Sequence, residues 1–252
     1  MAIEVFNRYE HKYLLDKETF DKVIGYMDKY MIPDKHNKNH TFYTISNIYY
    51  DTDDDYLIRK SLSKPVYKEK LRLRSYGVPD NDGKVFLEIK KKFDGIVNKR
   101  RTKLTLKEAY NFIKTGQKPV YAEYMNTQVL NEIAFLLNRY DLKPKLYLAY
   151  DRIAYFEKGN SDLRISFDTN IRSRRYDVGL EYGEYGEKLL DDGMYVMEIK
   201  TSFAKPIWLC DMLTELKIKR KSFSKYGTEF KKTVNNEKNT VAIWGINNGK
   251  FS

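Results

Sequence analysis

Charged residues alternate with apolar residues along two predicted strands in the stretch 70–92. The charged positions of these strands are Lys70, Arg72, Arg74, Glu88, Lys90 and Lys92. Side chains alternate along a strand, so both charged rows lie on one face if the strands pair across the turn at 79–83. Crowded cations repel one another unless water, carboxylates or an anionic ligand compensates them. This face is therefore either an ordinary solvated surface or a binding surface for a dense polyanion.

The same alternation recurs on other predicted strands, at Glu10, Lys12, Arg152, Arg164, Glu198 and Lys200. One solvated strand face is common, but six such strands would leave the sheet with little apolar interior on that side. A closed antiparallel barrel removes the difficulty, because polar side chains can point into a lumen that holds water and ligand while the outer face packs on helices. We therefore expect an α+β fold with a charged lumen.

The composition favours anionic partners. The chain has 252 residues, with 46 Lys and Arg against 35 Asp and Glu, and a formal charge of +11. Such a charge attracts nucleic acid, membrane surfaces and phosphorylated metabolites. The only cysteine, Cys210, cannot form an internal disulfide, which indicates a reducing compartment. The N-terminus has no apolar signal core and no stretch reaches the roughly 20 apolar residues of a membrane span, so we expect a cytoplasmic chain with no membrane segment.

Strands and helices are predicted along the whole chain. Further strands are expected at 3–15, 41–51, 145–156, 163–172 and 194–200, with another that carries Lys99, Arg100, Arg101 and Lys103. Helices are expected at 17–30, just after 51–55, at 106–115, 122–140 and 206–216. Asp16 is predicted to cap the first helix. The last helix should bury Ile207, Trp208, Leu213 and Leu216, and Cys210 should lie in the core.

The carboxylates among the cations narrow the choice of ligand. Glu10, Glu88 and Glu198 are predicted to lie within the basic faces. A nucleic-acid groove gains from cations and loses from acids, so we do not expect nucleic acid as the partner. The mixture suits a metal–phosphate ligand, because Mg²⁺ or Mn²⁺ binds carboxylate oxygen while Arg and Lys bind phosphate oxygen.

Other kinds of site are disfavoured by the sequence. The three histidines, His11, His36 and His40, have neither a cysteine partner nor an HExxH spacing, so a zinc site is not expected. The chain also has no Walker loop and no kinase-type glycine loop. A bound nucleotide would therefore have to be held by its phosphates.

Eight short motifs, in this order, resemble a known family. They are RYEHKY, IYYDT, KLRLRSYG, VFLEIKKKFDGIVNKRR, YDRIAYF, DLRISFD, YVMEIK and FSKYG. Together they are similar to the catalytic domain of the vacuolar transporter chaperone polyphosphate polymerases, which are triphosphate tunnel metalloenzymes. The resemblance implies one domain over residues 1–230, followed by a tail over 231–252. It also implies an eight-stranded antiparallel tunnel and a phosphotransferase that moves the γ-phosphate of ATP to polyphosphate, with Mn²⁺ or Mg²⁺, and releases ADP.

The resemblance also implies roles for individual residues. Phosphate would be bound by the motif cations Lys12, Arg72, Arg74, Lys90, Arg152, Arg164 and Lys225. Either Arg100 or Arg101 corresponds to a further basic position, and we also expect Lys200 and Tyr150 to contact substrate. Glu198 corresponds to the metal-binding glutamate of the family, and Glu10 and Glu88 are secondary metal candidates.

Two alternatives to the polymerase stay open. A polyphosphate end is already an anionic nucleophile, so polymerisation needs no dedicated base, whereas hydrolysis needs a water oriented by an acid such as Glu10 or Glu88. A tunnel triphosphatase would therefore share nearly all the site residues. The net charge alone would also fit a non-catalytic polyanion-binding module.

Overall fold

The strands form a single antiparallel sheet in the computed structural model, which describes residues 9–34, 37, 41–94, 96–202 and 204–235. The strands are β1 Tyr9–Leu15, β2 Met31–Pro33, β3 Tyr43–Asp51, β4 Tyr67–Tyr76, β5 Lys84–Phe93, β6 Ile96–Thr105, β7 Lys143–Glu157, β8 Asn160–Arg174, β9 Glu187–Lys188 and β10 Tyr195–Thr201. The helices are α1 Lys17–Met27, α2 Tyr56–Leu62, α3 Leu106–Thr115, α4 Thr127–Arg139 and α5 Ile207–Glu215, and residues 225–235 are also helical. No helix of these residues is long and apolar enough to span a membrane.

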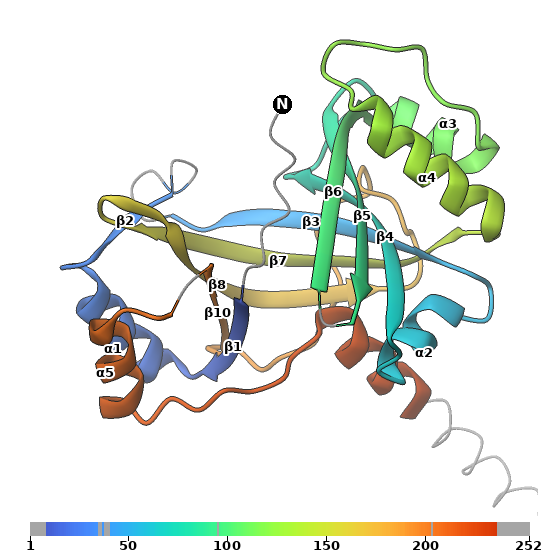
Figure 1. Ribbon diagram of the computed structural model, residues 1–252. Coiled ribbons are helices and arrows are strands. Elements are labelled where there is room, and N and C mark those ends of the chain that lie inside the picture. Colours follow the sequence, from blue (N-terminus) through green and yellow to red (C-terminus); the bar gives the residue numbers. More distant parts are fainter. Residues whose placement is uncertain (1–8, 35–36, 38–40, 95, 203, 236–252) are drawn as a thin grey trace, which may run out of the picture.

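Eight strands follow one another across the sheet, in the order β1-β10-β8-β7-β3-β4-β5-β6, while β2 and β9 are short additions beside β7 and β8. Figure 1 shows β4, β5 and β6 running across the direction of β3 and β7, so the sheet bends sharply around one face. The register places Arg72 opposite Glu88 and Lys70 opposite Lys90. The two charged rows predicted from the sequence therefore lie on the same face of the β4–β5 hairpin.

The prediction of a closed eight-stranded barrel is wrong, because the sheet has ten strands and is open. No pairing joins β1 to β6 among the described residues. The outer edge of β1 is instead occupied by the segment before the last helical stretch. Tyr13 forms a bridge with Arg220, and the backbone N–H of Lys221 donates to the carbonyl of Lys12 at 2.8 Å. The middle of the free edge of β1, at Lys12 and Tyr13, is thus already paired with this segment.

Helices cover the outer face of the sheet, as predicted. Helices α3 and α4 lie against β4, β5 and β6 (Figure 1), where Phe112 and Ile133 pack in one cluster with the strand residue Leu87. Helices α1 and α5 lie beside β1 and β10, where Val23 and Leu209 join a second cluster. Apolar side chains therefore occupy the outer face of the strands, which leaves the inner face to the charged rows.

Local sequence signals place several helix ends correctly. Asp16 accepts a hydrogen bond from the backbone N–H of Thr19 at 2.8 Å and caps α1. Thr105 and Glu108 form a capping box, and α3 has the predicted bounds. Helix α4 is shorter than predicted because Asn126 is its N-cap, with the N–H of Val129 donating to its side chain.

Helix α5 corrects two predictions about burial. Ile207 is 80% exposed and Cys210 is also exposed, whereas Leu209 and Met212 form the buried stripe. The reason is the helical period of 3.6 residues, which turns Ile207 and Cys210 away from the sheet when Leu209 and Met212 face it. The sequence of the stretch 172–193 predicts a loop or an irregular hairpin, and the structure has the end of β8 and the short strand β9 paired there. Strand residues predicted at 3–8, together with His36 and His40, lie outside the described residues.

We expect Asp51 to be a main local support of this fold. It is fully buried, and its carboxylate accepts hydrogen bonds from the N–H of Leu57 at 2.7 Å, the N–H of Ile58 at 2.9 Å and the hydroxyl of Tyr226 at 3.1 Å. Asp51→Ala leaves these donors without a partner and should lower the free energy of unfolding by about 3 kcal/mol, measured by urea denaturation.

The matched control is Asp53→Ala, two residues away. Its carboxylate is 70% exposed and pairs with Lys143 at the surface. This change should alter the free energy of unfolding by no more than about 0.5 kcal/mol. Equal effects of the two substitutions would contradict the supporting role of Asp51.

Candidate functional site

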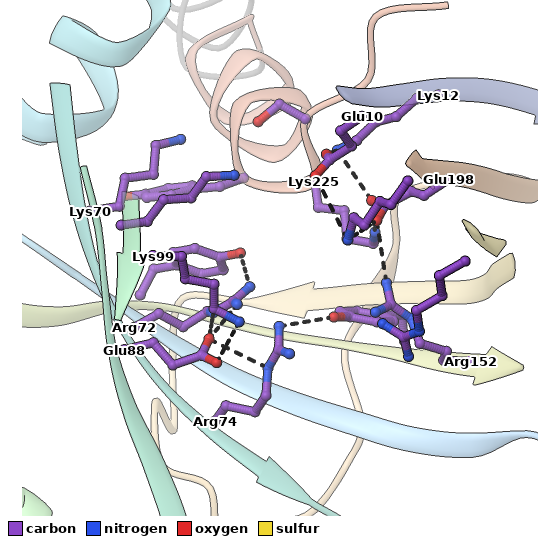
Figure 2. A pocket seen from close by; sticks show the side chains of 17 residues that line it. Glu10, Lys12, Lys70, Arg72, Arg74, Glu88, Lys99, Arg152, Glu198 and Lys225 are labelled. Carbon is purple, nitrogen blue, oxygen red and sulfur yellow. Dashed lines mark hydrogen bonds and ion pairs between the residues drawn. The ribbon is translucent and has the colours of Figure 1, made fainter. Parts of the chain in front are cut away.

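A cavity of about 250 Å³ lies on the inner face of the bent sheet. All eight strands of the main path contribute to it, and so does the start of the last helical stretch (Figure 2). Its lining residues are Glu10, Lys12, Tyr49, Lys70, Arg72, Arg74, Glu88, Lys90, Lys99, Tyr150, Arg152, Arg164, Glu198, Lys200, Ser224, Lys225 and Tyr226. The open sheet thus surrounds one cavity even though its edge strands are not paired.

The cavity has a large excess of positive charge. Ten of its lining residues are Lys or Arg, and three are Glu. Cations a few ångströms apart repel by several kcal/mol at the dielectric of a protein surface, so this arrangement requires compensating anions. The three glutamates supply part of the compensation, and the remainder is available to an anionic ligand.

Glu88 is the centre of one group of charges, the Glu88 cluster, formed with Arg72, Arg74 and Lys99. Glu88 is 2% exposed, and Arg72 Nε donates to its Oε2 at 2.9 Å. Lys99 Nζ lies 2.8 Å from Oε1, and Arg74 Nε lies 3.8 Å from Oε2. Although burial favours the neutral acid, these three cations hold the pKa of Glu88 well below its usual value.

The arginines of the Glu88 cluster are also held by neutral side chains. Arg72 Nη1 donates to the hydroxyl of Tyr49 at 3.3 Å. Arg74 Nε donates to Asn47 Oδ1 at 3.0 Å, and its Nη2 donates to the hydroxyl of Tyr150 at 3.2 Å. Both guanidinium groups are therefore fixed before any ligand binds.

A second group, the Glu198 cluster, is formed by Glu198, Glu10, Lys12 and Lys200. Figure 2 shows Glu10, Lys12 and Glu198 across the cavity from Glu88. Lys12 Nζ lies 3.2 Å from both Glu10 and Glu198, and Lys200 Nζ lies 3.1 Å from Glu198. Lys12 also donates to the carbonyl of Phe223 at 3.2 Å. Burial disfavours the charged form of Lys12, but Glu198 and Glu10 outweigh it and raise its pKa. The ammonium of Lys12 is therefore permanently charged and fixed in position.

Asp168, behind the cavity wall, is a residue whose role the sequence did not reveal. It is fully buried and accepts two hydrogen bonds from Arg152, at 2.5 and 2.7 Å. It also pairs with Lys225. Asp168 therefore connects β7 to the last helical stretch and aims two of the predicted phosphate-binding cations. Its position on the charged face of β8, two residues after Ser166, was the only available signal.

Lys70 and Lys90, together with Lys99 of the Glu88 cluster, are cavity lysines whose charged forms are disfavoured by burial. Neither Lys70 nor Lys90 has a carboxylate within 4 Å among the described residues, although Lys70 lies over the Tyr226 ring at 5.7 Å. Burial lowers the pKa of Lys70 to about 8, and Lys90 adds to this. Burial, together with Arg72 and Arg74, also lowers the pKa of Lys99 to about 7 against the opposing effect of Glu88. These lysines are thus sensitive to an added negative charge.

The cavity contains twelve of the fourteen residues that the sequence singled out. The exceptions are Arg100 and Arg101. Arg100 lies on the other face of β6, where it pairs with Glu132 of α4. Arg101 shares the inner face but lies over the Phe86 ring, 4.6 Å from its centroid. The cavity position on β6 is occupied by Lys99, which strand alternation from Arg101 would have indicated. Tyr49, Ser224 and Tyr226 were also missed.

The three glutamates predicted for metal do not come together. Glu88 lies in its own cluster, enclosed by cations, whereas Glu10 and Glu198 flank Lys12. Across the residues that the structure describes, no three His, Cys, Asp or Glu side chains are grouped to hold a metal ion by themselves. Glu88 is therefore an ion-pair partner of the arginines in this arrangement and does not share a site with Glu198.

Comparisons with known proteins agree with this geometry. The model of the VTC domain family matches residues 7–234. The chain belongs to the VTC domain family. The vacuolar transporter chaperone complex subunit 4 of Schizosaccharomyces pombe is 27% identical over 169 residues, which are 55% of this chain and 23% of that protein. The subunit 4 protein of Trypanosoma brucei brucei is 28% identical over 163 residues, which are 55% of this chain and 21% of that protein.

The chain thus matches less than a quarter of the length of these relatives. Among solved structures, a proposed adenylate cyclase from Bacillus halodurans has a TM-score of 0.50 at 17% identity, with 85% of this chain and 92% of that chain covered. At this identity the similarity concerns the fold. The family resemblance read from the eight motifs is confirmed.

The lowered lysine pKa values predict that anion binding takes up protons. At pH 8, Lys99, with a pKa of about 7, is largely neutral in the empty cavity, and Lys70 is about half neutral. A bound tripolyphosphate favours the charged forms and raises both pKa values. Calorimetry at pH 8 in two buffers of different ionisation enthalpy should therefore detect proton uptake, which should vanish at pH 6, where both lysines are already charged.

Lys99→Met should reduce this uptake, because one titrating group is removed. Lys103→Met is the matched control, since Lys103 lies on the same face of β6 but outside the cavity. Tripolyphosphate binding at pH 8 with the same enthalpy in both buffers would contradict the assignment.

Proposed function

We propose that this chain is a metal-dependent polyphosphate polymerase, which transfers the γ-phosphate of ATP to the end of a polyphosphate chain and releases ADP. The observation that carries the proposal is the cavity with ten cations against three carboxylates, in a member of the VTC domain family. An extended polyanion is the ligand that such a lining compensates best. The relatives described above are subunits of a vacuolar transporter chaperone complex, which is compatible with this proposal.

The cavity suits phosphoryl transfer because that reaction asks mainly for alignment and charge neutralisation. Arg72 and Arg74 approach from one wall, and Arg152 and Lys225 approach from the other (Figure 2). Cations on both walls can hold the two phosphate groups in line. A terminal oxygen of the polymer attacks the γ-phosphorus, the bond from that phosphorus to the β,γ-bridging oxygen breaks, and ADP leaves with the electron pair of that bond.

The ionisation of the carboxylates favours transfer to polyphosphate over hydrolysis. Cations lower the pKa of Glu88, Glu198 and Glu10 against the opposing effect of burial. A carboxylate with a lowered pKa is a poor general base, so none of the three is tuned to activate water. A polyphosphate end needs no such base, because it is already ionised at neutral pH.

Glu198 and Glu10 are the residues that would hold a divalent cation. Both carboxylates reach Lys12 and Lys200, which shows that one small cationic centre can contact the two side chains together. Two carboxylates are too few for an all-protein site, but Mg²⁺ and Mn²⁺ commonly complete their coordination with water and substrate phosphates. The donor set therefore fits such an ion, which would neutralise charge on the transferred phosphate.

The product assay tests the proposed reaction directly. Purified protein given ATP and Mn²⁺ should convert ATP to ADP and acid-labile polymer, and chelation of the metal with EDTA should stop both. Gel electrophoresis of the polymer and chromatography of the nucleotides measure the two products. Free phosphate as the sole product would contradict the polymerase and identify a triphosphatase.

Substitution of Glu198 separates catalysis from binding. Glu198→Gln keeps the shape but removes a charge that a metal ion requires, so ATP turnover should fall by about 100-fold or more. Glu132→Gln is the matched control, because Glu132 pairs with Arg100 and Lys91 outside the cavity. A non-catalytic binding module would instead show no ATP turnover even in the unaltered protein. The unaltered protein and Glu198→Gln would then both still bind tripolyphosphate.

A further inference from the structure

Three aromatic rings form a row beside the cavity, which we call the aromatic row, made of Tyr43, Tyr76 and Phe86. The centroids of Tyr43 and Tyr76 are 6.0 Å apart, and those of Tyr76 and Phe86 are 5.8 Å apart in an edge-to-face arrangement. The rings come from β3, β4 and β5, which are neighbours in the sheet. They lie on the inner face, because Tyr76 follows Arg74 by two residues and Phe86 precedes Glu88 by two.

Strand register connects the aromatic row to the phosphate-binding cations. Phe86 lies directly opposite Arg74, and Tyr43 lies directly opposite Arg152. Both arginines line the cavity, but none of the three rings does. The row therefore continues the cavity at the end where Arg74 and Arg152 stand. Lys70 lies on the same face of β4 but four residues before Arg74, about 13 Å along the strand and away from the aromatic row.

We propose that the aromatic row binds the nucleobase of the nucleoside triphosphate whose phosphates enter the cavity. This inference rests on the proposed function only in taking a nucleotide as the phosphate donor. A base stacked on Tyr76 would place its triphosphate toward Arg74 and Arg152, and from there toward Lys70 and Lys90. The donor and the growing polymer would thus approach from opposite ends of the cavity.

Accessibility and charge both suit a base at this position. Tyr76 is 49% exposed, and Phe86 contacts its ring edge-to-face. Arg101 lies over Phe86 at 4.6 Å and brings a planar cation to the same end. Aromatic rings and guanidinium planes are the surfaces on which bases stack, and such stacking is tolerant of base identity.

The row also gives Arg101 a place in substrate binding. The sequence predicted a further basic position at Arg100 or Arg101, and the structure keeps both out of the cavity. Arg100 pairs with Glu132 on the far face of β6, whereas Arg101 has no carboxylate within 4 Å among the described residues. Arg101 therefore contributes at the nucleobase end.

The test compares a ligand that has a base with one that has none. ADP and pyrophosphate, each with Mg²⁺, are titrated by calorimetry into the full chain and its variants. Tyr76→Leu should weaken ADP binding by about fivefold to 100-fold, while pyrophosphate binding changes by less than about twofold. Tyr76→Phe keeps the ring and should retain ADP affinity. Phe135→Leu on α4 is the control for loss of an exposed aromatic residue, since Phe135 is 68% exposed.

An equal loss for both ligands, or no loss for either, in Tyr76→Leu would overturn the proposal. If Tyr76→Leu unfolds the chain, Arg101→Gln serves as the second variant, and it too should weaken ADP more than pyrophosphate. Both titrations measure binding without turnover. Release of phosphate alone from ATP would therefore refute the polymerase but leave the nucleobase site intact. A working polymerase in which Tyr76→Leu leaves the ratio of ADP affinity to pyrophosphate affinity unchanged would refute the nucleobase site alone.

Discussion

Burial of three carboxylates beneath a concave layer of cations is the constraint on which the rest of this structure depends. Glu88 and Glu198 lie in the cavity wall and Asp168 lies behind it, all of them enclosed. Without these acids the cations would repel across the cavity, and a buried ion pair that loses one partner typically costs about 3 to 5 kcal/mol. The buried acids therefore allow the cations to lie close together. Because the acids are fewer than the cations, the cavity keeps an excess of positive charge.

Charged side chains of the cavity also attach the segment after α5 to a sheet whose two edge strands, β1 and β6, do not pair with each other. Lys12 on β1 contacts the carbonyl of Phe223, and Lys225 pairs with Asp168 on β8. The segment that follows α5 is thus attached to the wall at two charged points, beside the edge of β1 that it covers through Arg220. Side-chain contacts and this segment complete the enclosure that backbone hydrogen bonds leave open. The bent sheet and the attached segment after α5 therefore surround the cavity although the sheet does not close into a barrel.

Strand positions and the charged faces could be read from the sequence because both depend on local alternation. The two charged rows of the β4–β5 hairpin could be placed on one face because side chains alternate along each strand. Closure of the sheet and the separation of Glu88 from Glu198 could not be read this way, because they depend on how distant strands approach. The exposure of Cys210 was missed for a different reason, since an apolar helix gives a weak signal of which face is buried.

The cations of the cavity divide into two kinds with different consequences for a moving ligand. Arg72, Arg74 and Arg152 carry guanidinium groups that are held by carboxylate, amide and hydroxyl oxygens, so they form a rigid positive surface. Lys70, Lys90 and Lys99 lie on flexible stems, and burial favours their neutral forms. In the proposed polymerase, the polymer advances by one phosphate in each cycle and would need contacts that release as easily as they form. Lysines whose charged forms are disfavoured by burial and favoured by bound phosphate would suit that requirement, whereas a lining made only of fixed arginines would hold the chain in one register.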